Sequence, residues 1–263
     1  MTSAPPQVTA AVHATAERIA ELLRPCADPS VRIPGAQWTV GEAAAHLVMA
    51  NELMAELAEG HERPYGDGTA GSLAAANAAS LQAFPERDPA VLAEGIVRHA
   101  RAFTDAAAGR PGEQPVVTPL GPMDLATLGS YLVAHMLGHG WDIAAALRRP
   151  HMIDTAAVEA TVPFVMAAMP RVLSAAAAGH TARYDLRVRG GSRFAVTFTD
   201  GAAEVTPELQ GRPDVTIVAE PVTFLLIALG RRTATGAVAR GKILAWGRKP
   251  WLAPRFPSLF TAP

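Results

Sequence analysis

The stretch GSYLVAHMLGHGWDIAAAL, residues 129–147, places His135 and His139 four positions apart in a segment with the composition of a helix. Positions i and i+4 of an α-helix lie one turn apart on the same face. Two imidazoles so placed can hold one metal ion, and Asp142 follows on that face as a third ligand or an orienting acceptor. Such a pair also arises by chance, so this stretch alone leaves two unrelated polar residues as the alternative.

The stretch QWTVGEAAAHL predicts the start of another helix. Thr39 at the N-cap and Glu42 three positions later have the spacing of a capping box, and the helix should run to about residue 58. His46 lies in its first two turns, among alanine and aliphatic residues that mark a buried face. A buried neutral histidine is commonly satisfied by a hydrogen bond, which is the simpler alternative to a ligand role.

Three histidines from two helices of one bundle can form a metal site. His46, His135 and His139 would supply three nitrogen ligands and leave open positions, the form expected of a catalytic rather than a structural metal. Imidazoles suit zinc, and also nickel, copper or iron. The sequence therefore predicts a candidate metal centre and leaves the identity of the ion open among these metals.

The rest of the chain divides by hydrophobic period. Helical spacing, caps and breaking prolines predict further helices over residues 8–23, 72–84, 88–108, 124–147 and 154–178. After Gly179 the period changes to alternation, and YDLRVRGGSRFAVTFTDGAAEVTP reads as a β-meander. A strand in PDVTIVAE, a helix in PVTFLLIALGRR and a segment of mixed character in VARGKILAW follow. We predict a mainly α four-helix bundle over residues 1–180 and a small α+β domain over residues 181–263.

Composition excludes several classes of function. The formal net charge of −1 and the pI near 6.7 offer no field for nucleic acid. No apolar run is long enough to cross a bilayer, and the N-terminal residues do not have the pattern of a secretory signal. The single cysteine, Cys26, rules out an internal disulfide and is expected to be an inert packed residue. A cytoplasmic protein, monomeric or homodimeric, is the resulting expectation.

Several segments together resemble one family. QWTVGEAAAHL, PERDPAVLAEGI and LVAHMLGHGWDIAAAL look like the DinB-like metalloproteins, specifically the mycothiol-dependent maleylpyruvate isomerase family. DVTIVAEPVTFLLIALGRRTATGAVARGKILAWG resembles the sterol-carrier-like domain that follows the bundle in that family. The resemblance implies a divalent metal, usually zinc, held by residues that match His46, His135 and His139. It also implies that the thiol in the reaction is an external cofactor, mycothiol, rather than Cys26.

One position departs from the family pattern. The maleylpyruvate isomerases proper have a glutamate where this chain has His135. Three neutral ligands leave the site one unit more positive than a His₂Glu set, which makes it a stronger Lewis acid. Metal binding is therefore expected to persist, whereas maleylpyruvate as the substrate does not carry over.

Positive groups are needed for an anionic thiol or substrate, and the resemblance implies an arginine of the second domain facing the metal. The basic candidates are Arg231, Arg232, Arg240, Lys242 and Arg248. We select Arg240 and Arg248 as candidate catalytic residues because they flank the terminal strand, with ordinary surface arginines as the alternative. Asn77 and Glu52 are candidates for the border of the site. Trp38 and Trp141 are expected to pack the bundle.

Three functions remain open from sequence. The first is a metalloenzyme that uses a low-molecular-weight thiol for isomerisation, S-transfer or thiol exchange on a small electrophilic substrate. The second is a metal-dependent hydrolase or lyase on the same scaffold, with water in place of the thiol. The third is a non-catalytic carrier of small molecules, against which the three histidines argue, since a carrier has no need of them.

Overall fold

The computed structural model describes residues 6–67 and 70–261. The chain divides into two compact units, Met1–Ile153 and Asp154–Pro263. We expected the division near residue 180. It lies earlier because the helix that follows Ile153 packs within the second unit, where Glu159 accepts hydrogen bonds from the backbone N–H and the hydroxyl of Ser192. Across the described ranges, no helix is both long enough and apolar enough to span a membrane.

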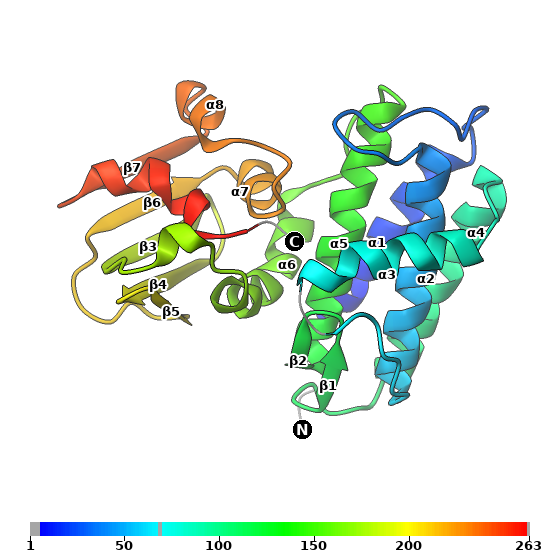
Figure 1. Ribbon diagram of the computed structural model, residues 1–263, viewed down its shortest axis with the longest axis horizontal. Helices are drawn as coiled ribbons and strands as arrows, with labels where there is room; N and C mark the ends of the chain where they lie inside the picture. Colours follow the sequence, from blue (N-terminus) through cyan, green and yellow to red (C-terminus); the bar gives the residue numbers. More distant parts are fainter. Residues whose placement is uncertain (1–5, 68–69, 262–263) are drawn as a thin grey trace. The chain divides into compact units, whose positions relative to one another are not determined.

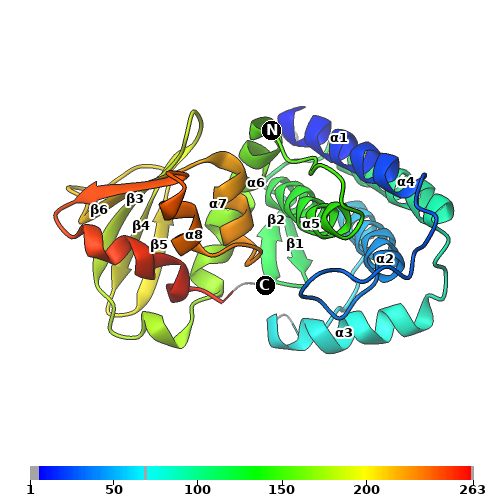
Figure 2. The ribbon, with the colours of Figure 1, turned by 90° about the horizontal axis from the view of Figure 1, so that it is seen from above.

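The first unit is helical, as predicted. Its elements are α1 (Pro6–Leu23), α2 (Val40–Glu59), α3 (Ala70–Ala83), α4 (Pro89–Ala107), β1 (Pro115–Thr118), β2 (Gly121–Asp124) and α5 (Leu125–Ala146). Helices α1, α2, α4 and α5 pack on one another as a four-helix bundle, while α3 packs against α2 from outside that group (Figures 1 and 2). The mainly α bundle predicted from the sequence is confirmed.

Local signals in the sequence set the ends of the bundle helices. The Thr39 side chain accepts from the backbone of Glu42, whose carboxylate accepts from the backbone of Thr39 in return, so the predicted capping box of α2 is present. Gly60 ends α2 with a φ of 94°, a left-handed conformation that glycine adopts without strain. Asp88 and Asp124 are the N-cap residues of α4 and α5, and their side chains accept hydrogen bonds from backbone N–H groups of the first turn.

A short hairpin departs from the prediction. Residues 109–122 were predicted to be a loop between two helices, but β1 and β2 pair antiparallel, with Val116 opposite Met123 and Val117 opposite Pro122. The proline and glycine content of the segment hid this pairing, since four-residue strands carry little periodic signal. The hairpin ends directly at the N-cap of α5, so it sets where the histidine-bearing helix begins.

The second unit is α+β. Its elements are α6 (Thr155–Ala168), η1 (Met169–Arg171), η2 (Ala175–Ala177), β3 (Ala182–Val188), β4 (Arg193–Thr199), β5 (Ala202–Thr206), β6 (Val215–Ala219), α7 (Pro221–Ala228), α8 (Ala234–Ala239), β7 (Ile243–Gly247) and η3 (Pro250–Leu259). The strand order is β5-β4-β3-β6-β7, with β3 and β6 parallel and the other neighbours antiparallel. The predicted meander is β3 to β5, and the segment of mixed character divides into α8 and β7.

Aromatic packing covers one face of this sheet. Tyr184 of β3 lies 4.6 Å from Phe256 of η3, and Phe194 of β4 lies 6.2 Å from Phe224 of α7, both between ring centroids. Tyr184, Phe194 and Phe198 are fully buried. Because side chains alternate along a strand, the residues between them point to the opposite face.

One predicted helix is shorter in the structure. We expected a kinked helix over residues 154–178, but α6 ends at Ala168 and two short 3₁₀ turns follow. Pro163 is accommodated inside α6, whereas Pro170 lies where the helix has already given way to η1. A proline lacks the N–H that the helix would need, and it clashes with the preceding turn.

Candidate metal centre

Three imidazoles converge inside the helical bundle. His46 comes from α2, and His135 and His139 come from successive turns of α5. One ring nitrogen from each lies within 4.8 Å of the corresponding nitrogens of the others, and the His46 and His135 Nε2 atoms are 3.0 Å apart. The three ring centroids are 4.7 to 4.9 Å from one another. The two helices therefore bring together the three histidines that the sequence singled out.

Burial fixes the protonation state of His46. The residue is 5% exposed, and loss of solvation lowers its pKa to about 4. At neutral pH the ring is uncharged and offers one lone pair, as a metal ligand must. Its Nδ1 atom is buried and has no hydrogen-bond partner among the described residues. Its Nε2 atom faces Nε2 of His135, so the alternative of a core histidine satisfied by a protein hydrogen bond covers that nitrogen alone.

Aromatic side chains enclose the histidines. The ring of Trp38 stacks on His139 at 5.7 Å and 26° between planes, and it is tilted against His46 at 4.8 Å. Tyr131, one turn before His135 on α5, meets that ring edge-on at 6.2 Å. Burial, with the nearby Tyr65 in a smaller role, raises the pKa of Tyr131, so its phenol stays protonated.

The structure places Asp142 beside the centre rather than in it. Its Oδ2 atom lies 3.6 Å from Nδ1 of His139, and both side chains are largely buried. A carboxylate next to the outer nitrogen of a ligating histidine orients the ring and raises its basicity. Of the two roles that the sequence left open for Asp142, this geometry fits the orienting one.

The donor set fits a small divalent ion. Bonds of about 2.0–2.1 Å from imidazole nitrogen to zinc, at tetrahedral angles, require nitrogen–nitrogen separations of roughly 3.3 Å. The separation of 3.0 Å between the His46 and His135 nitrogens and the outer limit of 4.8 Å bracket that value, so small side-chain shifts would complete the geometry. Three neutral nitrogens leave positions open for a further ligand.

Other candidates take separate places. Asn77 of α3 accepts a hydrogen bond of 2.7 Å from the Tyr65 hydroxyl, and Glu52 is exposed on α2. Trp141 lies against His151 at 5.0 Å between ring centroids. The thiol of Cys26 donates to the carbonyl of Asp28 at 3.5 Å in the loop after α1. The structure thus brings Trp38 to the centre and leaves Trp141 outside it.

The sequence did not point to Tyr131 or to the site contacts of Trp38. The available signal was position alone, because Tyr131 precedes His135 by four residues and Trp38 precedes the N-cap of α2 by one. An aromatic residue at either position is as consistent with bundle packing as with a site. Trp38 therefore packs in the bundle, as expected, and contacts two of the histidines from the same position.

The two selected arginines belong to the second unit. Arg248 forms an ion pair of 2.6 Å with Asp214, a carboxylate that Lys249 also approaches to 3.3 Å. Arg240 is exposed at the end of α8, and no ion-pair partner for it is present within residues 6–67 and 70–261. Of the two, Arg240 keeps its charge more available to a ligand.

Comparison with known proteins matches both units. Residues 9–144 match the protein-family domain described as the mycothiol maleylpyruvate isomerase N-terminal domain, and residues 159–254 match the C-terminal domain of the same proteins. No functionally curated protein matches the sequence.

Among solved structures, the chain is similar to a mycothiol-dependent maleylpyruvate isomerase, at 14% identity and a TM-score of 0.54, over 89% of this chain and 94% of that one. A histidine-to-alanine mutant of such an isomerase gives 13% identity and a TM-score of 0.55, over 88% and 93%. At these identities the likeness concerns the fold.

Proposed function

The chain belongs to the mycothiol-dependent maleylpyruvate isomerase family, a family of thiol-dependent enzymes, and from this premise we propose that it is a metalloenzyme acting with mycothiol. Its reaction is isomerisation, S-transfer or thiol exchange on a small electrophilic substrate. The helical bundle of the first unit holds the metal, and the α+β domain contributes to substrate binding. The protein acts in the cytoplasm, as a monomer or homodimer, without nucleic acid or membrane.

The convergence of three imidazoles carries this proposal. His46 and His135 face each other through their Nε2 atoms at 3.0 Å, and His139 completes the group. Two neutral imidazoles share at most one hydrogen between such nitrogens, whereas a cation satisfies the lone pairs of all three. We propose zinc, with nickel or iron as alternatives that suit the same ligands. A divalent ion held there supplies Lewis acidity, which lowers the pKa of a coordinating thiol.

The protein groups around the centre have separable roles. Trp38 lies against two of the histidine rings and shields them from water, which strengthens electrostatic interactions at the site. Asp142, whose carboxylate lies 3.6 Å from Nδ1 of His139, is proposed to orient that ring. The protonated phenol of Tyr131 is a neutral hydrogen-bond donor close to His135. These groups position the ligands and leave the open side of the centre to thiol and substrate.

Arg240 and Arg248 are proposed to attract the anionic reactant. Arg240 is the stronger candidate because Asp214 already engages Arg248. Replacing Arg240 with glutamine should raise KM for an anionic substrate with little change in metal content. The same change at Arg212, an exposed arginine between β5 and β6, serves as the control. Equal effects of the two changes on KM would show that only overall charge matters.

Metal content of the purified protein tests the proposal first. We expect about one equivalent of zinc or a similar ion by elemental analysis, lost in His139→Ala because two imidazoles bind far more weakly than three. His61→Ala removes an exposed histidine and should leave the content unchanged. If the wild-type protein is folded but does not bind added zinc, nickel or iron, the three histidines are core residues. The carrier alternative would then be favoured.

Thiol dependence is tested separately with the metal-loaded protein. Maleylpyruvate and a panel of small electrophiles would be followed with and without mycothiol, in the wild type and in His139→Ala. Turnover that requires both the thiol and His139 supports the proposal. Turnover that requires His139 but not the thiol would replace it with the hydrolase or lyase alternative.

A further inference from the structure

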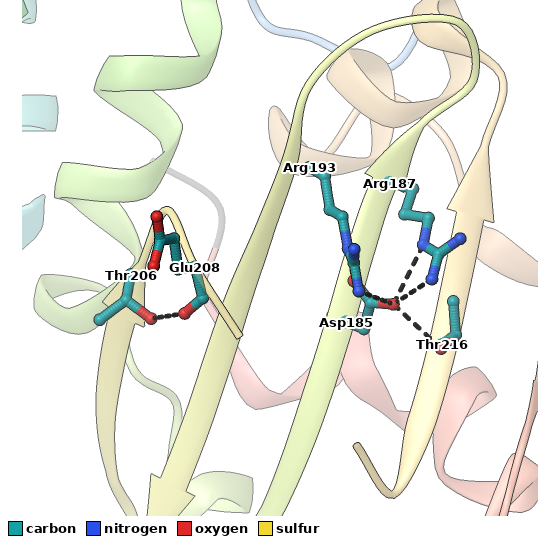
Figure 3. A network of polar contacts seen from close by, with 6 residues as sticks. All are labelled: Asp185, Arg187, Arg193, Thr206, Glu208 and Thr216. Atoms are coloured by element: carbon teal, nitrogen blue, oxygen red, sulfur yellow. Dashed lines mark hydrogen bonds and ion pairs between the residues drawn. The ribbon is translucent and has the colours of Figure 1, made fainter. Parts of the chain in front are cut away.

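A buried carboxylate lies on the second face of the C-terminal sheet. Asp185 is in the middle of β3, next in sequence to Tyr184, so its side chain points away from the aromatic face. It is only 1% exposed, although the flanking residues of that face carry polar side chains. Figure 3 shows Arg187, Arg193 and Thr216 gathered around it from three neighbouring strands.

Two arginines hold this carboxylate in fixed geometry. Arg187 donates from Nε and Nη2 to Oδ2, at 3.0 and 2.7 Å. Arg193 donates from Nε to Oδ1 at 2.7 Å and from Nη2 to Oδ2 at 3.2 Å, and the Thr216 hydroxyl adds a bond of 3.2 Å. Paired N–H donors on a carboxylate fix the planes of both guanidinium groups. Asp185 therefore fixes the orientation of two guanidinium groups.

The cluster has more charge than its own carboxylate neutralises. Two guanidinium groups face one carboxylate, so the sum is one positive charge. The side chains of Arg187 and Arg193 are 39% and 52% exposed, and their Nη1 groups have no hydrogen-bond acceptor among the described residues. Each guanidinium keeps N–H donors for another acceptor. One arginine would be enough to neutralise the charge of Asp185.

An exposed aromatic ring lies beside the arginines. The Arg187 guanidinium carbon is 5.8 Å from the centroid of the Trp246 ring, within the range of a cation–π contact. Strand register places Trp246 opposite Thr216 and Leu244 opposite Val218, so both side chains share the face of Asp185. Trp246 is 47% exposed and Leu244 is 51% exposed. Charged donors and an uncovered apolar surface are thus adjacent.

We propose that this face is a binding site for a small organic anion with a ring. Its carboxylate or phosphate accepts from Arg187 and Arg193, and its flat apolar part lies on Trp246 and Leu244. A planar oxyanion can accept hydrogen bonds from the outward edges of the two guanidinium groups. The exposed indole offers a flat surface on which a ring can stack. A second copy of this chain fits less well, because like-charged arginine clusters would meet. Its residues all belong to β3, β4, β6 and β7, so the proposal does not rest on the proposed metal chemistry.

Phenyl phosphate and benzoate are the probes that test the site on the full-length protein. Calorimetric titration should give saturable binding of at least one of them, with a dissociation constant of about 1 mM for so small a ligand. The tighter of the two identifies phosphate or carboxylate as the preferred group. Inorganic phosphate, which has no ring, should bind at least about tenfold more weakly than phenyl phosphate.

Charge-preserving variants separate recognition from folding. Arg187→Lys and Arg193→Lys keep an ion pair for Asp185 but lose the paired donors, so each should weaken binding at least about tenfold. Trp246→Leu removes the ring from an exposed position and should weaken binding of phenyl phosphate, whereas Trp251→Phe, at another exposed tryptophan, should not. Arg212→Lys is the matched charge control. Circular dichroism would verify that each variant is folded.

Two results would overturn the proposal. One is the absence of saturable binding for both aromatic anions, which would leave the arginines as partners of Asp185 alone. The other is binding that Arg187→Lys, Arg193→Lys and Trp246→Leu all leave unchanged, which would place the probe elsewhere. Amide chemical shifts of residues 185–187 and 244–246 during the titration would locate the bound probe directly.

Discussion

At the scale of single residues, the carboxylate of Asp142 lies beside His139 of the centre. Asp142→Asn should lower metal affinity about tenfold, because the ring would lose the negative charge that orients it and raises its basicity. Competition with a zinc chelator would measure this change. Glu59→Gln is a matched control, since Glu59 lies 3.4 Å from His61 in an exposed pair outside the centre. Equal affinities for wild type and Asp142→Asn would remove the orienting role.

The sequence was sufficient to find the three histidines but not their surroundings. His135 and His139 are related by helix geometry alone, and His46 follows a recognisable helix start, so both relations can be deduced from residue spacing. The contact between Trp38 and the rings depends on how α2 meets α5, which no local pattern encodes. The cluster around Asp185 was missed for the same reason, since its partners come from different strands.

At the scale of secondary-structure elements, the capping box of α2 supports both the helix and the centre. Thr39→Ala should lower the free energy of unfolding by about 1 kcal/mol, because the first-turn N–H group would lose its acceptor. Urea unfolding would measure the loss. Since Trp38 directly precedes the cap and lies against His46, metal affinity should also fall.

Thr39→Ser is the control for that change. Serine keeps the hydroxyl acceptor, so stability and metal affinity should both stay near the wild-type values. If alanine and serine lowered metal affinity equally, the effect would come from the threonine methyl group and not from the cap.

Helices were predicted more accurately than the shorter elements. The ends of α2, α4 and α5 follow from side chains that cap them, so their predicted and observed bounds agree closely. The β1–β2 hairpin and the 3₁₀ turns after α6 are too short for a periodic signal, and tertiary packing decides them. The residues between α7 and η3 were ambiguous because α8 and β7 have only six and five residues.

At the scale of the whole molecule, the acid stability of the second unit should depend on Asp185. Its burial opposes ionisation, but hydrogen bonds from Arg193 and Arg187 hold its pKa below the ordinary value of 3.8. A carboxyl whose pKa is lowered by folding stabilises the folded state fully above the unfolded pKa, and this stabilisation is lost as the pH falls through the lower folded value. The unfolding free energy should therefore decrease as the pH drops below about 3.8.

Asp185→Asn isolates that contribution. The variant should be less stable than wild type at pH 5, because two arginines lose their partner, and its stability should change less between pH 5 and pH 3. Denaturant unfolding at both pH values would measure the difference. Asp105→Asn removes an exposed carboxylate from α4 and should keep the wild-type pH response. The same response in Asp185→Asn as in wild type would assign the acid sensitivity to other carboxyl groups.

An ion at the histidine centre would also cross-link a chain that has only one cysteine and therefore no internal disulfide. His46 and His135 are 89 positions apart in sequence, so an ion held by both would close a long loop of the chain. Closing a loop of that size removes entropy from the unfolded chain worth about 4–5 kcal/mol in disulfide-linked proteins. Here the cross-link would be reversible, because a chelator would remove the ion and with it the constraint on the unfolded chain. The resulting decrease in the midpoint of thermal unfolding would measure how much the ion stabilises the bundle.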